Sequence, residues 1–219
     1  MAKYNELTQG QIEATVNKLG GMEGVQRFLS GKSTVKSVSP FDFKVWKTIG
    51  LGTGLVAASN FESALRSKGQ VAYDLSKKML RSSAFTVEES KREVDLVLIT
   101  SEELGFKDSA TRRDIYERAQ ELGLTICPPE VGPQLRLQYE DQPCGQHLNI
   151  GMEPIEVYSK TETEYWGALF RVEHSAVAPI CLPSGKIGSI KEVALGHETA
   201  GESFKHDKNK QWVFVKPRK

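Results

Sequence analysis

The sequence predicts an α+β fold: a mostly antiparallel sheet of four to five strands, helices covering one face, and a helical hairpin at the N-terminus. The clearest strand is residues 93–100 (EVDLVLIT), a β-branched and almost wholly apolar run typical of a strand covered on both faces. Shorter strand patterns at 147–152, 165–172 and 211–215 favour antiparallel pairing. Helical periodicity between these runs predicts the second layer of the fold.

Two parts are expected along the chain. Residues 1–38 are predicted to form the helical hairpin and its linker, and residues 39–219 a single α+β domain. Thr8 and Gln11 have the spacing of a capping box, in which each side chain satisfies a free backbone N–H at a helix start. The pair Gly20-Gly21 separates the two predicted helices, and a small, polar, proline-ended stretch follows the second helix as a linker.

The second helix of the hairpin is the predicted partner-binding surface. Its apolar residues recur at helical spacing, and a hairpin of this size is too small to fold without docking on something. We therefore expect a protein partner or self-association through Met22, Val25, Arg27 and Phe28. A DNA-binding helix-turn-helix is less favoured, because Glu23 lies where such proteins carry basic and polar residues toward the groove.

Composition limits the other functional classes. The chain has 219 residues, 39% hydrophobic and 26% charged, and a net charge of +1, so no global field favours nucleic acid or a membrane. The three cysteines, Cys127, Cys144 and Cys181, form no C-x-x-C pair, so neither a disulfide framework nor a zinc site is indicated. No signal peptide or spanning apolar run is evident. We expect a cytoplasmic protein without cofactor or metal.

Further elements are predicted inside the main domain: a strand at 47–51 and helices at 59–69, 71–81 and 111–122. The glycines after the strand suggest a phosphate loop, but Leu55 stands where a third glycine is needed, so a simple turn is favoured. The arginines of the last helix alternate with acidic residues. We expect them to be surface charges that mostly pair within the helix, namely Arg112, Arg113 and Arg118.

The segment 129–139 is ambiguous between a helix and a strand. Leu135, Leu137 and Tyr139 alternate as in a strand, whereas Val131, Leu135 and Tyr139 fall on one face of a helix. The helix is the favoured interpretation.

The densest polar cluster of the chain begins in this segment. An enzyme could use Glu130 and Asp141 as acid and base, Arg136 to bind an anion, and His147 beside them. The favoured interpretation is instead a solvated helix edge followed by a capped turn at Asp141.

Three segments resemble an uncharacterised family of bacterial hypothetical proteins: GGMEGVQRFLSG, VDLVLITSEELGFKDSATRRDIYERAQELGL and EVGPQLRLQYEDQP…LNIGMEPI, with a last strand similar to WVFVKPRK. The resemblance covers residues 15–154 and roughly the last ten. It implies a bacterial source, and it transfers no activity and no catalytic residue.

Residues 176–210 are expected to be rich in loops, because prolines and glycines surround their apolar residues. His174, His197 and His206 match no metal-ligand spacing, and a nucleophilic pair of Cys181 with one of them rests on residue type alone. The basic tail is expected to be solubilising.

Three functions follow, in order of preference. The first is a non-catalytic interaction or regulatory protein. The second is a small hydrolase or nuclease-like enzyme that uses the cluster around Glu130. The third is a nucleic-acid-binding protein that uses Arg27, the bases at 77–81 and the tail, which would have to lie on one face.

Overall fold

The computed structural model describes residues 8–34, 42–158, 165–181, 187–201 and 203–218. The chain forms two units, residues 1–38 and 39–219, which are described separately. The helices are α1 (Gln9–Lys18), α2 (Gly21–Leu29), α3 (Ala58–Ser67), α4 (Asp74–Leu80), α5 (Arg112–Glu121) and α6 (Val131–Gln138). The strands are β1 (Lys47–Leu51), β2 (Val71–Ala72), β3 (Arg92–Thr100), β4 (Ala110–Thr111), β5 (His147–Ile150), β6 (Ile155–Tyr158), β7 (Tyr165–Cys181), β8 (Ile187–Thr199), β9 (Lys205–His206) and β10 (Gln211–Lys216).

The first unit is a hairpin of α1 and α2. The predicted capping box of Thr8 and Gln11 is present, with both of its hydrogen bonds. Gly20 and Gly21 turn the chain between the helices at φ values of 91° and 73°, which favour glycine. The helices approach closely at Gly24, where an added Cβ would lie 1.6 Å from the backbone oxygen of Leu19. The large apolar side chains exposed on this unit are Ile12, Met22, Phe28 and Leu29. Two helices of this length therefore leave much of their apolar surface uncovered.

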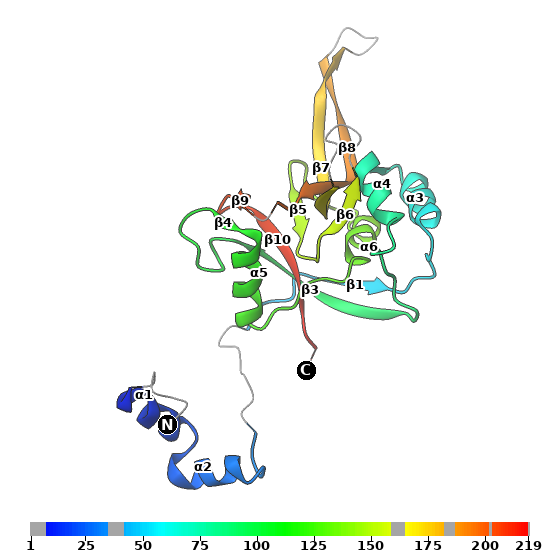
Figure 1. The fold of residues 1–219 in the computed structure, drawn as a ribbon. Helices are drawn as coiled ribbons and strands as arrows, with labels where there is room; N and C mark the ends of the chain where they lie inside the picture. The colour runs from blue at the N-terminus through cyan, green and yellow to red at the C-terminus, as the bar shows by residue number, and fades with distance from the viewer. Residues whose placement is uncertain (1–7, 35–41, 159–164, 182–186, 202, 219) are drawn as a thin grey trace. The chain divides into compact units, whose positions relative to one another are not determined.

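The sheet of the second unit differs from the predicted one. Its strand order is β1-β3-β10-β5-β7-β8-β2, with β6 paired to the first part of β7. The β10–β5 and β2–β8 pairs are parallel and the other pairs are antiparallel. The sheet therefore has eight mixed strands that curl into a half-barrel, and the expected sheet of four to five mostly antiparallel strands was wrong (Figure 1).

Two local predictions were wrong for physical reasons that the backbone shows. The stretch 176–210, expected to be rich in loops, contains all of β8, β9 and the end of β7. The β7 strand passes Pro179 at a register irregularity, where a ladder tolerates proline. The helix expected at 71–81 instead begins with β2, whose two residues extend the edge of β8. The α4 helix then starts at Asp74.

One face of the sheet is covered by α3 and α6. Phe170 of β7 points to this face, and Gly132 of α6 packs directly on it: a Cβ on Gly132 would lie 2.5 Å from the Cβ of Phe170. The ring of Phe85 lies 6.0 Å from Phe170 and 5.5 Å from Phe61 of α3. The predicted helix over 129–139 is confirmed, and the apolar side chains of α6 are buried here.

The opposite face of the sheet is covered by α5. Because side chains alternate along a strand, Arg171 points away from the face of Phe170. Arg171 pairs with Asn149, and Asn149 pairs with Trp212, so these three side chains lie on the same face of the sheet. Tyr116 of α5 packs edge-on against Trp212, with ring centres 5.9 Å apart. The expectation of helices on one face only was therefore wrong.

No helix in the described ranges is long and apolar enough to cross a bilayer.

Candidate functional site

Glu130 of the predicted polar cluster is fully buried at the start of α6. Its carboxylate accepts hydrogen bonds from the backbone N–H of Gly52 and of Glu88, each at 2.9 Å. The side-chain amide of Gln134 also donates to it at 2.9 Å. Three donors therefore compensate the burial of this charge, and the bonds fix two loops to the helix.

Gln134 and Gln138, which follow Glu130 at intervals of four residues, bind the same region of the chain from the same side of α6. Gln134 donates to Thr53 Oγ1 at 2.6 Å, and Gln138 makes two bonds with the backbone of Gly50, accepting from its N–H at 2.9 Å and donating to its carbonyl at 2.8 Å. The glycine turn after β1 is thus held by side chains of this helix, which accounts for its glycines without a phosphate.

Arg136 is also fully buried, on another side of α6. Its guanidinium donates to the side chain of Gln142 and to the backbone carbonyls of Tyr139 and Glu173. Burial lowers its pKa to about 10, so it stays charged at neutral pH. The group fastens the end of α6 to β7 and faces no solvent.

The two remaining predicted residues lie elsewhere. Asp141 is exposed and pairs with Lys47 at 3.4 Å. His147 lies at the start of β5, where its Nδ1 is 3.1 Å from Glu173 Oε2. The structure therefore places Glu130, Arg136, Asp141 and His147 in separate environments and does not bring them together.

A second polar group, the Glu173 cluster, consists of Tyr73, His147, Arg171, Glu173 and Glu192. Glu173 is buried and accepts a hydrogen bond from Arg171 Nε at 2.8 Å in addition to its contact with His147. The hydroxyl of Tyr73 donates to Glu192 Oε1 at 2.5 Å. Burial, the bond to Glu192 and the charge of Glu173 all raise the pKa of Tyr73, which remains a hydrogen-bond donor.

Hydrogen bonds within the cluster connect β5 to β7, and β8 to Tyr73, the residue after β2, while Arg171 also pairs with Glu198 at 2.9 Å. Among the described residues, no three histidine, cysteine or carboxylate side chains come together in a way that could hold a metal ion.

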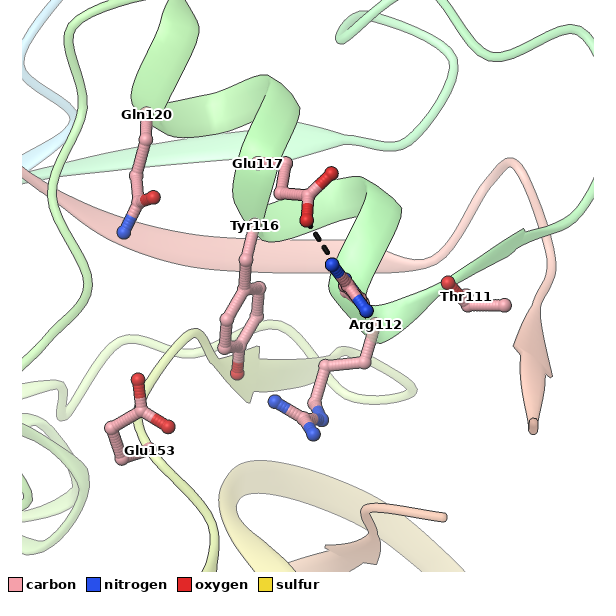
Figure 2. A pocket seen from close by; sticks show the side chains of 7 residues that line it. Thr111, Arg112, Tyr116, Glu117, Gln120 and Glu153 are labelled. Carbon is pink, nitrogen blue, oxygen red and sulfur yellow. Dashed lines mark hydrogen bonds and ion pairs between the residues drawn. The ribbon is translucent and has the colours of Figure 1, made fainter. Parts of the chain in front are cut away.

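A pocket lies beside α5, on the face of the sheet that carries Trp212. Its volume is about 380 Å³. We call it the α5 pocket, and its lining residues are Thr111, Arg112, Arg113, Tyr116, Glu117, Gln120 and Glu153 (Figure 2). Thr111 caps α5 together with Asp114, so six of these positions are set by one helix and its cap. Glu153 comes from the loop after β5.

Arg112 is the unusual side chain of the pocket. It is half-buried, and its guanidinium carbon lies 5.3 Å from the centre of the Tyr116 ring. Its Nε is buried without a hydrogen-bond partner, and no carboxylate of the described ranges forms an ion pair with it. The neighbouring Arg113, by contrast, pairs with Glu117 at 2.8 Å. The expectation of mostly self-paired charge on this helix holds for Arg113 and Arg118, and Arg112 is the exception.

Tyr116 forms the floor of the pocket and anchors its far wall. Its hydroxyl donates to the backbone carbonyl of Met152 at 2.8 Å, next to Glu153. Figure 2 shows the Arg112 guanidinium and the Glu153 carboxylate on either side of the Tyr116 ring. Glu153 is exposed and forms no hydrogen bond or ion pair with any residue that the structure describes.

Below Tyr116, the sheet carries buried polar groups without partners. Trp212 Nε1, both ring nitrogens of His206 and both amide atoms of Asn149 are buried and form no hydrogen bond within the described part of the chain. The His206 and Trp212 rings lie 4.9 Å apart. Burial lowers the pKa of His206, so its ring is neutral at neutral pH.

No protein-family model, curated protein or solved structure matches the chain. The resemblance to bacterial hypothetical proteins therefore stays an expectation.

Proposed function

We propose that this protein is a non-catalytic binding protein whose main domain recognises an anionic group in the α5 pocket. One observation carries the proposal: Arg112, a half-buried guanidinium on the wall of a pocket of about 380 Å³, has no carboxylate partner in the described ranges. Guanidinium groups in partly desolvated sites bind carboxylates and phosphates strongly through paired hydrogen bonds.

The surroundings of Arg112 support this role. The guanidinium contacts the Tyr116 ring, with its carbon 5.3 Å from the ring centre, and the hydroxyl of Tyr116 is itself held by a hydrogen bond to the carbonyl of Met152. A charge that is held in one orientation before binding loses less conformational entropy when a ligand arrives. The volume also falls in the range of small-molecule sites, roughly 300–1,000 Å³.

Isothermal titration calorimetry of the full chain with inorganic phosphate and with butanoate tests the proposal. Arg112→Gln should weaken binding of both probes by about tenfold or more, because it removes the only unpaired cation of the pocket among the described residues. Arg66→Gln is the control, since it removes an exposed guanidinium of α3 that does not line the pocket. Equal losses in both variants, or no binding by the parent chain, would refute the proposal.

A second candidate function, self-association through the hairpin, is favoured by its exposed apolar side chains. Met22, Phe28 and Leu29 are exposed on α2, and Glu23 pairs with Arg27 at 2.7 Å, so the charges of this helix already neutralise each other. An apolar face without excess charge suits a second copy of itself, as in a bundle of two hairpins. Val25, also predicted to contact a partner, is half-buried within the unit.

Light scattering coupled to size-exclusion chromatography tests this second function. We expect the full chain to have a dimer mass and a chain lacking residues 1–38 to have a monomer mass. Met22→Glu with Phe28→Glu should also give a monomer, while Gln9→Glu, on the exposed surface of α1, should not. A monomeric full chain would exclude it.

The other two functions are not proposed. The hydrolase requires convergence of Glu130, Arg136, Asp141 and His147, and their side chains lie apart. Several of the bases suggested for nucleic acid are already paired with a carboxylate: Arg27 with Glu23, Lys77 with Asp74, Arg81 with Glu62, and Arg218 with Asp95. A cytoplasmic location and a bacterial source remain part of the proposal.

A further inference from the structure

We infer that the ligand of the α5 pocket is a small zwitterion, a molecule that carries an anionic group and an ammonium group at a defined separation. This inference rests on the proposed function and adds the role of Glu153. The pocket presents one guanidinium and one carboxylate that do not pair with each other and that have no other partner in the described ranges.

Tyr116 keeps these two charges apart. Its ring carries the Arg112 guanidinium at 5.3 Å, and its hydroxyl holds the carbonyl of Met152, the residue before Glu153, at 2.8 Å. Met152 is fixed from the other side as well, by a bridge to Cys127. The same buried tyrosine thus contacts one of the two charged side chains and the backbone beside the other (Figure 2).

The guanidinium of Arg112 and the carboxylate of Glu153 together favour a ligand that carries both a negative and a positive charge. An anion alone would bind to Arg112 but would be repelled by Glu153, and a cation alone would meet the reverse arrangement. A zwitterion of matching length removes both penalties, because each end forms a charge-assisted hydrogen bond. The shared feature could come from an amino carboxylate or from an amino-alkyl phosphate, and the experiment separates the two.

A series of ω-amino carboxylates measures the separation of the two charges. The full chain would be titrated calorimetrically with β-alanine, 4-aminobutanoate, 5-aminopentanoate and 6-aminohexanoate, and with butanoate and butylamine as single-charge controls. We expect one chain length to bind about tenfold more tightly than butanoate. O-phosphoethanolamine, compared with inorganic phosphate, tests whether the anionic end is a phosphate.

Variants distinguish this inference from the proposed function. Glu153→Gln should abolish the preference for the zwitterion and leave binding of butanoate and phosphate unchanged or tighter. Glu156→Gln is the control, since it removes an exposed carboxylate of β6 that does not line the pocket. Arg112→Gln should weaken every anionic probe.

Two outcomes would overturn the inference alone: an affinity that does not vary with chain length, or a zwitterion preference that survives Glu153→Gln. If Arg112→Gln changes no affinity, the proposed function fails with it. Circular dichroism of each variant, compared with the parent chain, verifies that a lost affinity does not reflect a lost fold.

Discussion

The carboxylate of Glu130 binds the backbone N–H of Gly52, a residue 78 positions earlier in the chain, at 2.9 Å. This bond joins the start of α6 to the turn after β1. A cluster that suggests acid–base chemistry in the sequence is thus used to close the fold between distant segments.

Glu130→Gln should therefore lower the free energy of unfolding by about 1–3 kcal/mol, because an amide offers one acceptor oxygen where the carboxylate serves two backbone N–H groups. Urea denaturation measures the change. Asp141→Asn, at an exposed ion pair, should change stability by less than about 0.5 kcal/mol. Comparable losses in the two variants would contradict the structural role of Glu130.

His206→Phe should make the protein less sensitive to acid. Burial lowers the pKa of His206 below its ordinary value, so below about pH 6.5 the unfolded chain binds more protons at this residue than the folded chain. Stability is therefore lost as the pH falls through this window, and phenylalanine removes that loss. It also removes two buried nitrogens without partners in the described part of the chain.

Denaturation of the parent chain and of His206→Phe at pH 7.5 and pH 5 tests this prediction. The variant should be at least as stable at pH 7.5, and its advantage should grow at pH 5. An advantage that stays constant with pH would mean that His206 is not the titrating group.

Arg218→Gln should destabilise the protein near neutral pH but not in strong acid. Hydrogen bonds from Arg218, and then from Thr48, lower the pKa of Asp95 to about 2. The unfolded chain binds more protons at Asp95 between about pH 4 and pH 2, so the stabilising contribution is present above this window and is lost as the pH falls through it. We expect the variant to be measurably less stable than the parent chain at pH 6 and equally stable near pH 2. A difference that persists at pH 2 would assign the effect to packing.

Gly196→Ala should disrupt the Glu173 cluster. A Cβ at this position would lie 2.5 Å from Glu173 Oε1, so the buried carboxylate would have to leave Arg171 and His147. A loss of about 1–3 kcal/mol is expected in thermal or urea unfolding. Gly50→Ala is the control, because a Cβ there meets no atom closer than 3.8 Å. An unchanged stability of Gly196→Ala would show that the carboxylate has room to move.

Local hydrophobic patterns predicted individual helices and strands, but they could not predict the number, order and pairing of the strands in the sheet. β3 follows from its apolar run alone, whereas α6 had to be chosen over a strand on the helical spacing of Val131, Leu135 and Tyr139. β8 was missed because Gly188 and Gly196 interrupt the alternation of apolar and polar residues along it. In addition, its consecutive residues Ala194 and Leu195 are both buried, one on each face of the sheet, so no alternation is visible there. The parallel β10–β5 pair joins segments far apart in the sequence, and no local pattern contains that information.

Only one of the two charges of the α5 pocket that have no partner in the described ranges could be predicted from the sequence. Arg113 and Arg118 have acidic residues three or four positions later, Glu117 and Glu121, whereas the corresponding positions for Arg112 are Ile115 and Tyr116. That spacing marks Arg112 as the arginine without a helical partner. Glu153 carries no such signal, since it reaches the pocket from a loop whose position depends on Tyr116.

The position of β10 determines when the domain can be completed during synthesis. β10 lies between β3 and β5, so both strands keep an unpaired edge until residues 211–216 have left the ribosome. Until then the nascent chain exposes apolar strands that are prone to aggregate, and the sheet closes only after translation has passed this point. Chaperones that bind unpaired strand edges are expected to act on this protein before its last strand is inserted.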